Sequence, residues 1–413
     1  MITLLYNISN LAGIGSPLSP LKGGELARLD NIRNAWLAIE EGRILAFGEM
    51  SQLDRNALGE VKEVLDVEGG MVLPAWCDSH THMVFAATRE LEFIDKIRGL
   101  SYAEIAAKGG GILHSARRLN EASEEDLYQL AWGRLQQAMK LGTGALEIKS
   151  GYGLTVEGEL KMLRVIRRLK EKAPIPIKAT FLGAHAYPPP FKDDHEGYIR
   201  LIEAEMLPRI AADELADYID VFCEDGFFSP EETERICRAG IRFGLKPKIH
   251  ANQLNLSGGT QVGVKTQAVS VDHLETMDEA AIQALAASPT IGTMLPTAAF
   301  FLRMAYPPAR RMIEAGAAMA LASDYNPGSS PSFNMNLVVA MACIQMKMLP
   351  EEAINAATIN GAFAMESAKE VGSIAIGKRA NLIITQPMEH LALLPYSFGS
   401  NLISKVLING QVV

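Results

Sequence analysis

From Val67 onward, short apolar runs alternate with longer amphipathic stretches. The stretches show helix starts, such as Ser123-Glu124-Glu125-Asp126 and Ser229-Pro230-Glu231-Glu232. Strands that alternate with helices form parallel sheets, and eight repeats predict a closed (β/α)8, TIM-like barrel of the α/β class rather than an open doubly wound sheet. The eight predicted strands are 71–74, 144–149, 177–184, 218–223, 247–251, 269–274, 290–295 and 317–323.

The two ends of the chain have a different pattern, of short strands joined by turns. Apolar segments at 36–39 and 43–48 flank a Glu41-Gly42 turn, whereas 10–30 is rich in Gly, Pro and Ser and is predicted to be mostly loop. Further strands are predicted at 374–376, 381–385, 406–408 and 412–413. Neither end has enough mass for a core of its own. We therefore expect 1–66 and 370–413 to combine into a small β-sandwich domain beside a barrel of 67–369.

Composition is ordinary for a globular enzyme, with 48% hydrophobic and 21% charged residues. The 39 basic and 48 acidic residues give a net charge of −9, and no long basic block argues for a nucleic-acid or anionic-membrane partner. The start of the sequence does not resemble a signal peptide, and no apolar run reaches the length of about 18 residues needed to span a membrane, so we expect a cytoplasmic protein. Four cysteines without Cys-x-x-Cys spacing are expected to be reduced thiols.

The first predicted barrel strand leads into Asp78-Ser79-His80-Thr81-His82. Residues two apart on a strand project from one face, and two adjacent imidazoles suit a transition metal. Taken alone, the pair is equally compatible with surface or capping histidines. However, His250 and Asp324 stand at the ends of later strands, which a barrel brings to one mouth. Cys77 is a further conceivable ligand, although it precedes the histidine pair.

The segments around His80, His250 and Asp324, together with several motifs between them, resemble the amidohydrolase superfamily. Within it they resemble the branch that opens an imidazolone ring in histidine degradation. The match at the chain ends holds only at superfamily level, and Asn381 stands where many members have Asp, remote from the barrel mouth. The motifs that carry the resemblance, in chain order, are Asp78-Ser79-His80-Thr81-His82, Arg89-Glu90, Lys108-Gly109-Gly110-Gly111-Ile112, Glu147-Ile148-Lys149-Ser150-Gly151-Tyr152-Gly153, Gly183-Ala184-His185-Ala186, Lys248-Ile249-His250-Ala251, Asp272-His273-Leu274-Glu275 and Ser323-Asp324-Tyr325-Asn326-Pro327-Gly328.

The resemblance implies one divalent or trivalent metal ion, zinc or iron, held by His80, His82, His250 and Asp324 with water completing the shell. Three neutral imidazoles and one carboxylate leave such an ion positive, which lowers the pKa of a bound water towards about 7. Asp324 is also expected to take a proton from the attacking water. We interpret Lys149, which in some superfamily members bridges two metals as a carboxylated lysine, as a structural residue or one that supports the ligands.

Roles in catalysis and substrate binding also follow from the resemblance. Without the resemblance, a lone strand histidine such as His273 could be an ordinary core residue; with it, His273 is expected to orient the water or the substrate oxygen. His185 is expected to bind the substrate and to stabilise the oxyanion. Arg89 is expected to clamp a substrate carboxylate. The segment 109–111 is expected to be a flap or a simple turn, and the neighbouring His114 has no assigned role. The other expected substrate contacts are Tyr152, Gln253, Asn326, Gly328 and Ser329.

The implied reaction is hydrolysis of 4-imidazolone-5-propanoate, a small molecule, to N-formimidoyl-L-glutamate, and the resemblance also suggests a homodimer. One alternative is a deaminase of the same superfamily that acts on a nucleobase-like ring. Such an enzyme needs no carboxylate clamp, so Arg89 distinguishes the two. A second alternative is a non-catalytic scaffold barrel, which would be marked by missing metal ligands, and none is missing here.

Overall fold

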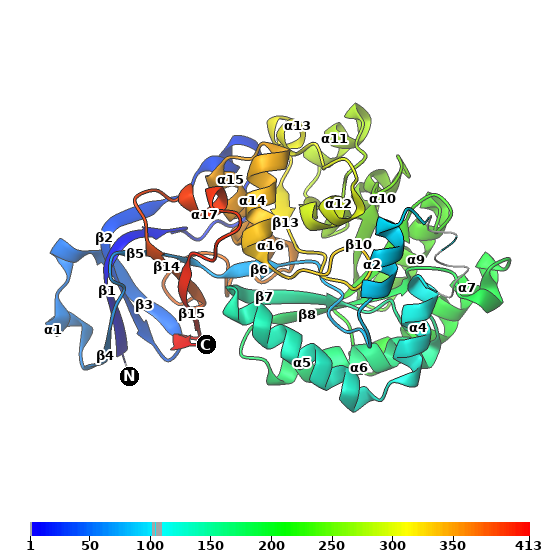
Figure 1. The fold of residues 1–413 in the computed structure, drawn as a ribbon, viewed down its shortest axis with the longest axis horizontal. Coiled ribbons are helices and arrows are strands. Elements are labelled where there is room, and N and C mark those ends of the chain that lie inside the picture. Colours follow the sequence, from blue (N-terminus) through cyan, green and yellow to red (C-terminus); the bar gives the residue numbers. More distant parts are fainter. Residues whose placement is uncertain (1, 101–103, 105–109) are drawn as a thin grey trace.

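The computed structural model describes residues 2–100, 104 and 110–413. Its centre is a parallel sheet of eight strands that follow one another around the barrel in sequence order (Figure 1). The barrel is nearly closed by the segments that follow its first and last strands, because His82 N donates to Tyr325 O at 2.8 Å and Asp324 N donates to His80 O at 3.0 Å. The strands are β6 (Trp76–Asp78), β7 (Thr143–Lys149), β8 (Ile177–Ala184), β9 (Tyr218–Cys223), β10 (Lys246–Ala251), β11 (Ser270–His273), β12 (Ile291–Met294) and β13 (Met319–Leu321).

One predicted barrel strand was wrong. The run at 71–74 is β5 (Gly70–Pro74), which pairs with β14 (Leu382–Pro387) outside the barrel. The chain crosses from one sheet to the other at Ala75, and Trp76 N then donates to Gly142 O at 2.8 Å beside β7. Apolar periodicity cannot show which sheet a buried strand joins, and this boundary falls inside one apolar run. The other seven predicted strands are confirmed to within about two residues at each end.

Both ends of the chain contribute to the second sheet, which lies beside the barrel (Figure 1). Its path is β16 (Gln411–Val412), β15 (Ile403–Ile408), β14, β5, β1 (Ile2–Ala12), β2 (Asn31–Glu40) and β3 (Arg43–Glu49), with β4 (Val61–Asp66) paired to β1. This arrangement confirms the predicted fold class, whereas the boundaries 1–66, 67–369 and 370–413 stay a prediction. The segment 374–376 is not a strand and makes only an Ile14–Ile374 bridge.

Helices surround the barrel (Figure 1). The predicted helix starts are confirmed, since Ser123 Oγ accepts from Asp126 N at 3.1 Å and Ser229 forms a capping box with Glu232. Among the described residues, no helix has the length and apolar character needed to cross a membrane. The helices are α1 (Arg55–Leu58), α2 (Glu90–Ile97), α4 (Ile112–Glu121), α5 (Glu124–Lys140), α6 (Val156–Lys172), α7 (His195–Leu201), α8 (Leu207–Ala212), α9 (Pro230–Arg242), α10 (Gly259–Lys265), α11 (Glu279–Ala286), α12 (Pro296–Leu302), α13 (Ala309–Glu314), α14 (Met335–Met346), α15 (Pro350–Ala357), α16 (Ile359–Ala364) and α17 (Leu393–Tyr396).

Candidate functional site

The four predicted metal ligands converge at the carboxyl ends of the barrel strands. His82 Nε2 lies 3.4 Å from His250 Nε2, and Asp324 Oδ1 lies 3.5 Å from the Nε2 atoms of both His80 and His82. All four side chains are buried. Cys77 does not join them, because it packs in a separate apolar cluster with Ala145 and Ala362.

Hydrogen bonding directs the imidazole lone pairs towards the centre of this group. His80 Nδ1 donates to Asp272 Oδ2 at 2.6 Å, which leaves Nε2 as an acceptor, and this buried atom has no hydrogen-bond partner among the described residues. His250 Nδ1 lies 3.0 Å from Asp220 Oδ2, which is a charge contact rather than a hydrogen bond of good geometry. Burial holds the pKa of His80 well below its usual range and also lowers the pKa of His250. Both rings are therefore neutral, and each has a lone pair that could bind a metal ion. Three imidazoles and one carboxylate in this arrangement fit a divalent metal ion.

A buried network of charges lies beneath the histidines. Lys149 Nζ donates to Glu147 at 2.7 Å and to Asp220 at 2.8 Å, and Lys248 Nζ donates to Glu147. Burial alone would lower the pKa of Lys149, but Asp220, Glu147 and Asp272 raise it overall, so the ammonium form is retained. Sequence reasoning missed this network, although charged residues inside predicted buried strands were a visible signal. The position of Lys149 agrees with its interpretation as a supporting residue.

His273 lies beside the four predicted metal ligands rather than in the apolar core. These ligands, His80, His82, His250 and Asp324, are called the metal group below. Its ring centre is 5.3 Å from that of His250 and 5.7 Å from that of His80. Nδ1 is 3.4 Å from Glu275 Oε1. Burial opposes a charge on this ring, but Glu275 and Asp324 together raise its pKa above the ordinary value. His273 is therefore suited to hydrogen-bond donation within the site.

His185 and Tyr152 form one wall of the site. The His185 ring is stacked on His82 at 5.5 Å, and the Tyr152 ring lies 5.7 Å from His185. His185 Nδ1 is 3.0 Å from Gly151 O, and because a carbonyl only accepts, this nitrogen carries the hydrogen. Burial lowers the pKa of His185 to about 3. The neutral ring then offers Nε2 as an acceptor, which differs from the expected donation to an oxyanion and suits a substrate N–H instead.

Arg89 precedes α2 and lies against the loop that follows Asp324. Its Nε and Nη2 atoms donate to Glu92 Oε2 at 2.9 and 2.5 Å. A Cβ on Gly328 would lie 2.4 Å from Arg89 Nη1, so a larger residue there would require the guanidinium to move. Arg89 also lines a cavity of about 410 Å³ together with Phe85 and Tyr325. The guanidinium is thus packed inside the molecule rather than exposed on its surface.

The polar groups after β13 bind one another. Asn326 Nδ2 donates to Asp324 O at 2.7 Å, and Asn326 Oδ1 accepts from Gly328 N and Ser329 N, both at 2.8 Å. Ser329 Oγ lies 3.4 Å from Asp324 Oδ2. These contacts fix the loop that carries Asp324, while a role in substrate binding stays a prediction. Gln253 is buried just after β10.

The segment 109–111 falls only partly within the described residues. Gly109 lies outside them, and Gly111 precedes α4 with a φ of +81°. Gly111 N donates to Glu92 Oε1 at 3.1 Å, which links α4 to the residue that holds Arg89. His114 Nδ1 lies 3.0 Å from Arg117 Nη2 on the same helix, and among the described residues it makes no contact that indicates a catalytic role.

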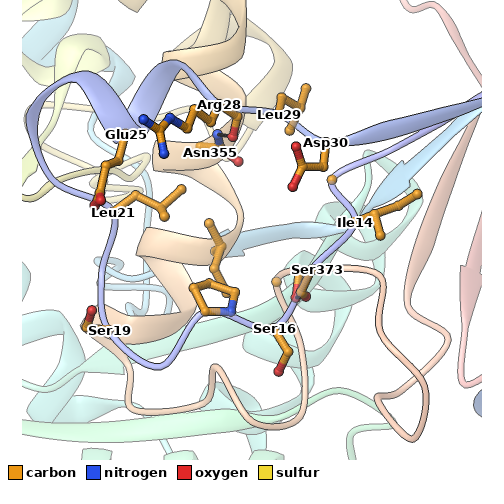
Figure 2. Close-up of a pocket in the computed structure, with 15 residues that line it drawn as sticks. Ile14, Ser16, Ser19, Leu21, Glu25, Arg28, Leu29, Asp30, Asn355 and Ser373 are labelled. Carbon is orange, nitrogen blue, oxygen red and sulfur yellow. Dashed lines mark hydrogen bonds between the residues drawn. The ribbon is translucent and has the colours of Figure 1, made fainter.

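A second cavity, of about 420 Å³, lies where the segment after β1 meets α15 and Ser373 (Figure 2). None of the predicted site residues lines it. Its charged side chains, from Glu25, Arg28 and Asp30, are of both signs and exposed. Within the part of the chain that the structure describes, no histidine and no buried carboxylate lines this cavity, so it differs from the barrel mouth, where such groups converge.

Comparisons with known proteins identify the family to which the chain belongs. The amidohydrolase family matches residues 71–413. The chain is 58% identical to an imidazolonepropionase of Flavobacterium johnsoniae over 100% of both chains, and 41% identical to one of a Geobacillus species over 99% of this chain and 97% of the relative. E. coli guanine deaminase superposes with a TM-score of 0.74 over 100% of this chain and 99% of that chain at 14% identity. A zinc-bound adenosine deaminase of Xanthomonas campestris gives a TM-score of 0.66 over 99% and 92% at 16% identity. At such identities the structural matches show the fold alone.

Proposed function

This chain belongs to the amidohydrolase family, and because its full-length relatives are imidazolonepropionases, we propose that it hydrolyses 4-imidazolone-5-propanoate to N-formimidoyl-L-glutamate. The observation that carries the proposal is the convergence of three buried imidazoles and Asp324, with His80 Nε2 left free of any hydrogen-bond partner among the described residues. The substrate is a small molecule. On the same resemblance we propose a homodimer and a cytoplasmic location.

His80, His82, His250 and Asp324 are proposed to hold one zinc or iron ion. When bound, such an ion acidifies a water molecule and polarises a carbonyl oxygen. The two elements share this donor set, so elemental analysis of the purified protein decides between them. Asp272 and Asp220 support the ligands by fixing the orientation of His80 and His250.

Asp324 is proposed to move the proton in the reaction. Burial favours its neutral form, but the surrounding histidines lower its pKa, so it is a carboxylate at neutral pH. It would accept a proton from the attacking water while the water oxygen bonds to the ring carbonyl carbon. Cleavage of the ring C–N bond then returns that proton to the leaving nitrogen. The net change is addition of one water, with no change in oxidation state.

Four further residues are proposed to bind the substrate. Arg89 would pair with the propanoate tail as a bidentate donor. His185 would accept a ring N–H through Nε2, and Tyr152, whose ring lies 5.9 Å from that of His82, would cover the same side of the ligand. His273, with its raised pKa, would donate to the carbonyl oxygen as negative charge develops there.

The proposal is tested by incubating purified, metal-analysed protein with freshly generated imidazolonepropanoate. We expect loss of the ring chromophore and appearance of N-formimidoyl-L-glutamate by NMR. His80→Ala serves as the control for metal-dependent turnover, because it removes one ligand from the barrel mouth. Failure of the metal-loaded wild-type protein to open the ring would contradict the proposed function.

A further inference from the structure

Glu159 is a buried carboxylate in the first turn of α6 that has no part in the chemistry described so far. Its side chain is fully buried. Its two oxygens accept three backbone hydrogen bonds, from Gly151 N at 3.0 Å, Gly153 N at 2.7 Å and Leu154 N at 3.0 Å. Burying a carboxylate away from water is costly unless it is hydrogen-bonded, and these three backbone contacts supply the hydrogen bonds that offset the cost.

The loop that Glu159 binds carries one wall of the candidate site. Tyr152 lies between two of the bound amides, and Gly151 O accepts the Nδ1 hydrogen of His185 at 3.0 Å. The same carboxylate therefore holds the loop that supplies Tyr152 and the carbonyl that sets the His185 tautomer. Both rings lie within 6 Å of His82, with centre separations of 5.9 and 5.5 Å.

The loop does not adopt a relaxed backbone. Gly151 has a φ of +108°, and Leu154, which is not a glycine, has a φ of +51°. A Cβ on Gly153 would lie 2.3 Å from the backbone of α6, so the two segments are in direct contact. A strained conformation of this kind persists only where surrounding contacts determine it, and the three hydrogen bonds to Glu159 are such contacts.

We propose that Glu159 is a positioning residue for substrate binding, which fixes residues 151–154 so that Tyr152 and His185 face the metal group. The inference rests on the proposed function only in that Tyr152 and His185 contact the substrate. Sequence reasoning did not identify Glu159, because an acidic residue in the first turn of a helix is common for reasons of the helix dipole.

The first test compares Glu159→Gln with Glu157→Gln. Glu157 is in the same turn but exposed, where it pairs with Arg209 at 2.7 Å, so its change removes a carboxyl group without touching the loop. In Glu159→Gln, one end of the side chain becomes an NH₂ donor that faces a backbone N–H. We expect kcat/KM for imidazolonepropanoate to fall by about 10-fold or more, mainly through KM, with metal content unchanged. Glu157→Gln should match wild type, and wild-type kinetics in Glu159→Gln would overturn the proposal.

A second measurement separates positioning from a general loss of stability. In a Tyr152→Phe/His185→Gln background, the groups that Glu159 positions are already altered, so Glu159→Gln should lower kcat/KM by less than about 2-fold. If Glu159→Gln lowers kcat/KM by the same factor in this background as in wild type, the proposal is overturned. If Glu159→Gln does not fold, Glu159→Asp withdraws the carboxylate by one methylene while keeping its charge, and the same measurements apply.

Crystal structures of wild type and Glu159→Gln test the positioning without any assay. We expect residues 151–154 to shift and the Tyr152 ring to leave its place beside His185, and an unchanged loop would overturn the proposal. If wild type itself does not open the imidazolone ring, the proposed function fails, and this structural comparison still decides the role of Glu159.

Discussion

His80 donates its Nδ1 hydrogen to Asp272 Oδ2 across 2.6 Å, and neither side chain is exposed to solvent. Burial favours protonation of Asp272, but Lys248 and Lys149 lower its pKa overall, so it is a carboxylate that only accepts. The contact therefore fixes both the tautomer and the orientation of His80, whose Nε2 faces the other predicted ligands.

Loss of this contact is expected to weaken metal binding. Asp272→Asn keeps the shape of the side chain but removes its charge, and we expect metal affinity to fall by about 10- to 100-fold. Competition with a chelator measures the affinity directly. His80→Ala, which removes the ligand itself, should bind no metal while the barrel stays folded. Wild-type affinity in Asp272→Asn would show that the carboxylate does not support the ligand.

His273→Ala is expected to separate catalysis from metal binding. If His273 donates to the substrate, the variant retains most of its metal and loses activity by about 10²- to 10⁴-fold. The test is needed because His273 is close enough to be a ligand itself: nitrogen and oxygen atoms of His80, His273 and Asp324 all lie within 4.8 Å of one another. Metal content and kcat are measured on the same preparation. A parallel loss of both would make His273 a ligand.

The barrel could be predicted from the sequence because strand and helix periodicities differ clearly over long stretches. The convergence of the four predicted ligands followed from that fold, since parallel strand ends meet at one mouth. The first barrel strand could not be assigned, because 71–77 contains one apolar run divided between two sheets. Which sheet accepts each half depends on β14, more than 300 residues away.

The residues that support the site could not be predicted from local pattern. Glu92 and Glu159 act by accepting backbone or guanidinium hydrogens, and any acidic residue in a first helical turn has the same appearance in the sequence. Glu147 and Lys248 are 101 residues apart, and only the closed barrel brings them together. The tautomer of His185 likewise depends on a carbonyl 34 residues before it.

The buried charge network makes a prediction about stability. Glu147 accepts from Lys149 and from Thr180 Oγ1, each at 2.7 Å, and from Lys248. Glu147→Gln leaves buried ammonium groups without that charge, and we expect the free energy of unfolding to fall by about 3–5 kcal/mol. Urea unfolding followed by circular dichroism measures the change. Glu125→Gln, which breaks a surface pair with Arg168, should lower the free energy of unfolding far less, and equal losses would contradict the expectation.

His185 predicts a dependence of stability on pH. Its pKa is about 3 in the folded chain, below the ordinary 6.5. Between these values the unfolded chain binds a proton that the folded chain does not, so stability falls as pH falls from 6.5 towards 3. One such group changes the free energy of unfolding by up to about 1.4 kcal/mol per pH unit. Urea unfolding of wild type and His185→Gln between pH 4.5 and 7 should show a shallower slope in the variant. Identical slopes would mean that His185 is protonated in the folded chain.

Substrate choice is expected to depend on Arg89. The imidazolone ring offers little for an enzyme to hold, whereas the propanoate tail carries a full charge away from the reacting carbon. Binding energy from such a remote group fixes the ring over the metal group. Glu92 holds the guanidinium through Nε and Nη2, which directs Nη1 towards Gly328 and the loop after Asp324.

Arg89→Ala should therefore lower kcat/KM for imidazolonepropanoate by about 10- to 150-fold, the value of a charge-assisted hydrogen bond of about 1.5–3 kcal/mol. Arg89→Lys should restore only part of this loss, because an ammonium group cannot make the paired contact. Both variants should retain their metal and should turn over an analogue ring that lacks the carboxylate as wild type does. The measurement is kcat/KM for the two compounds in wild type and both variants. Equal losses on both compounds would show that Arg89 does not bind the tail and would favour a deaminase-like substrate without a carboxylate.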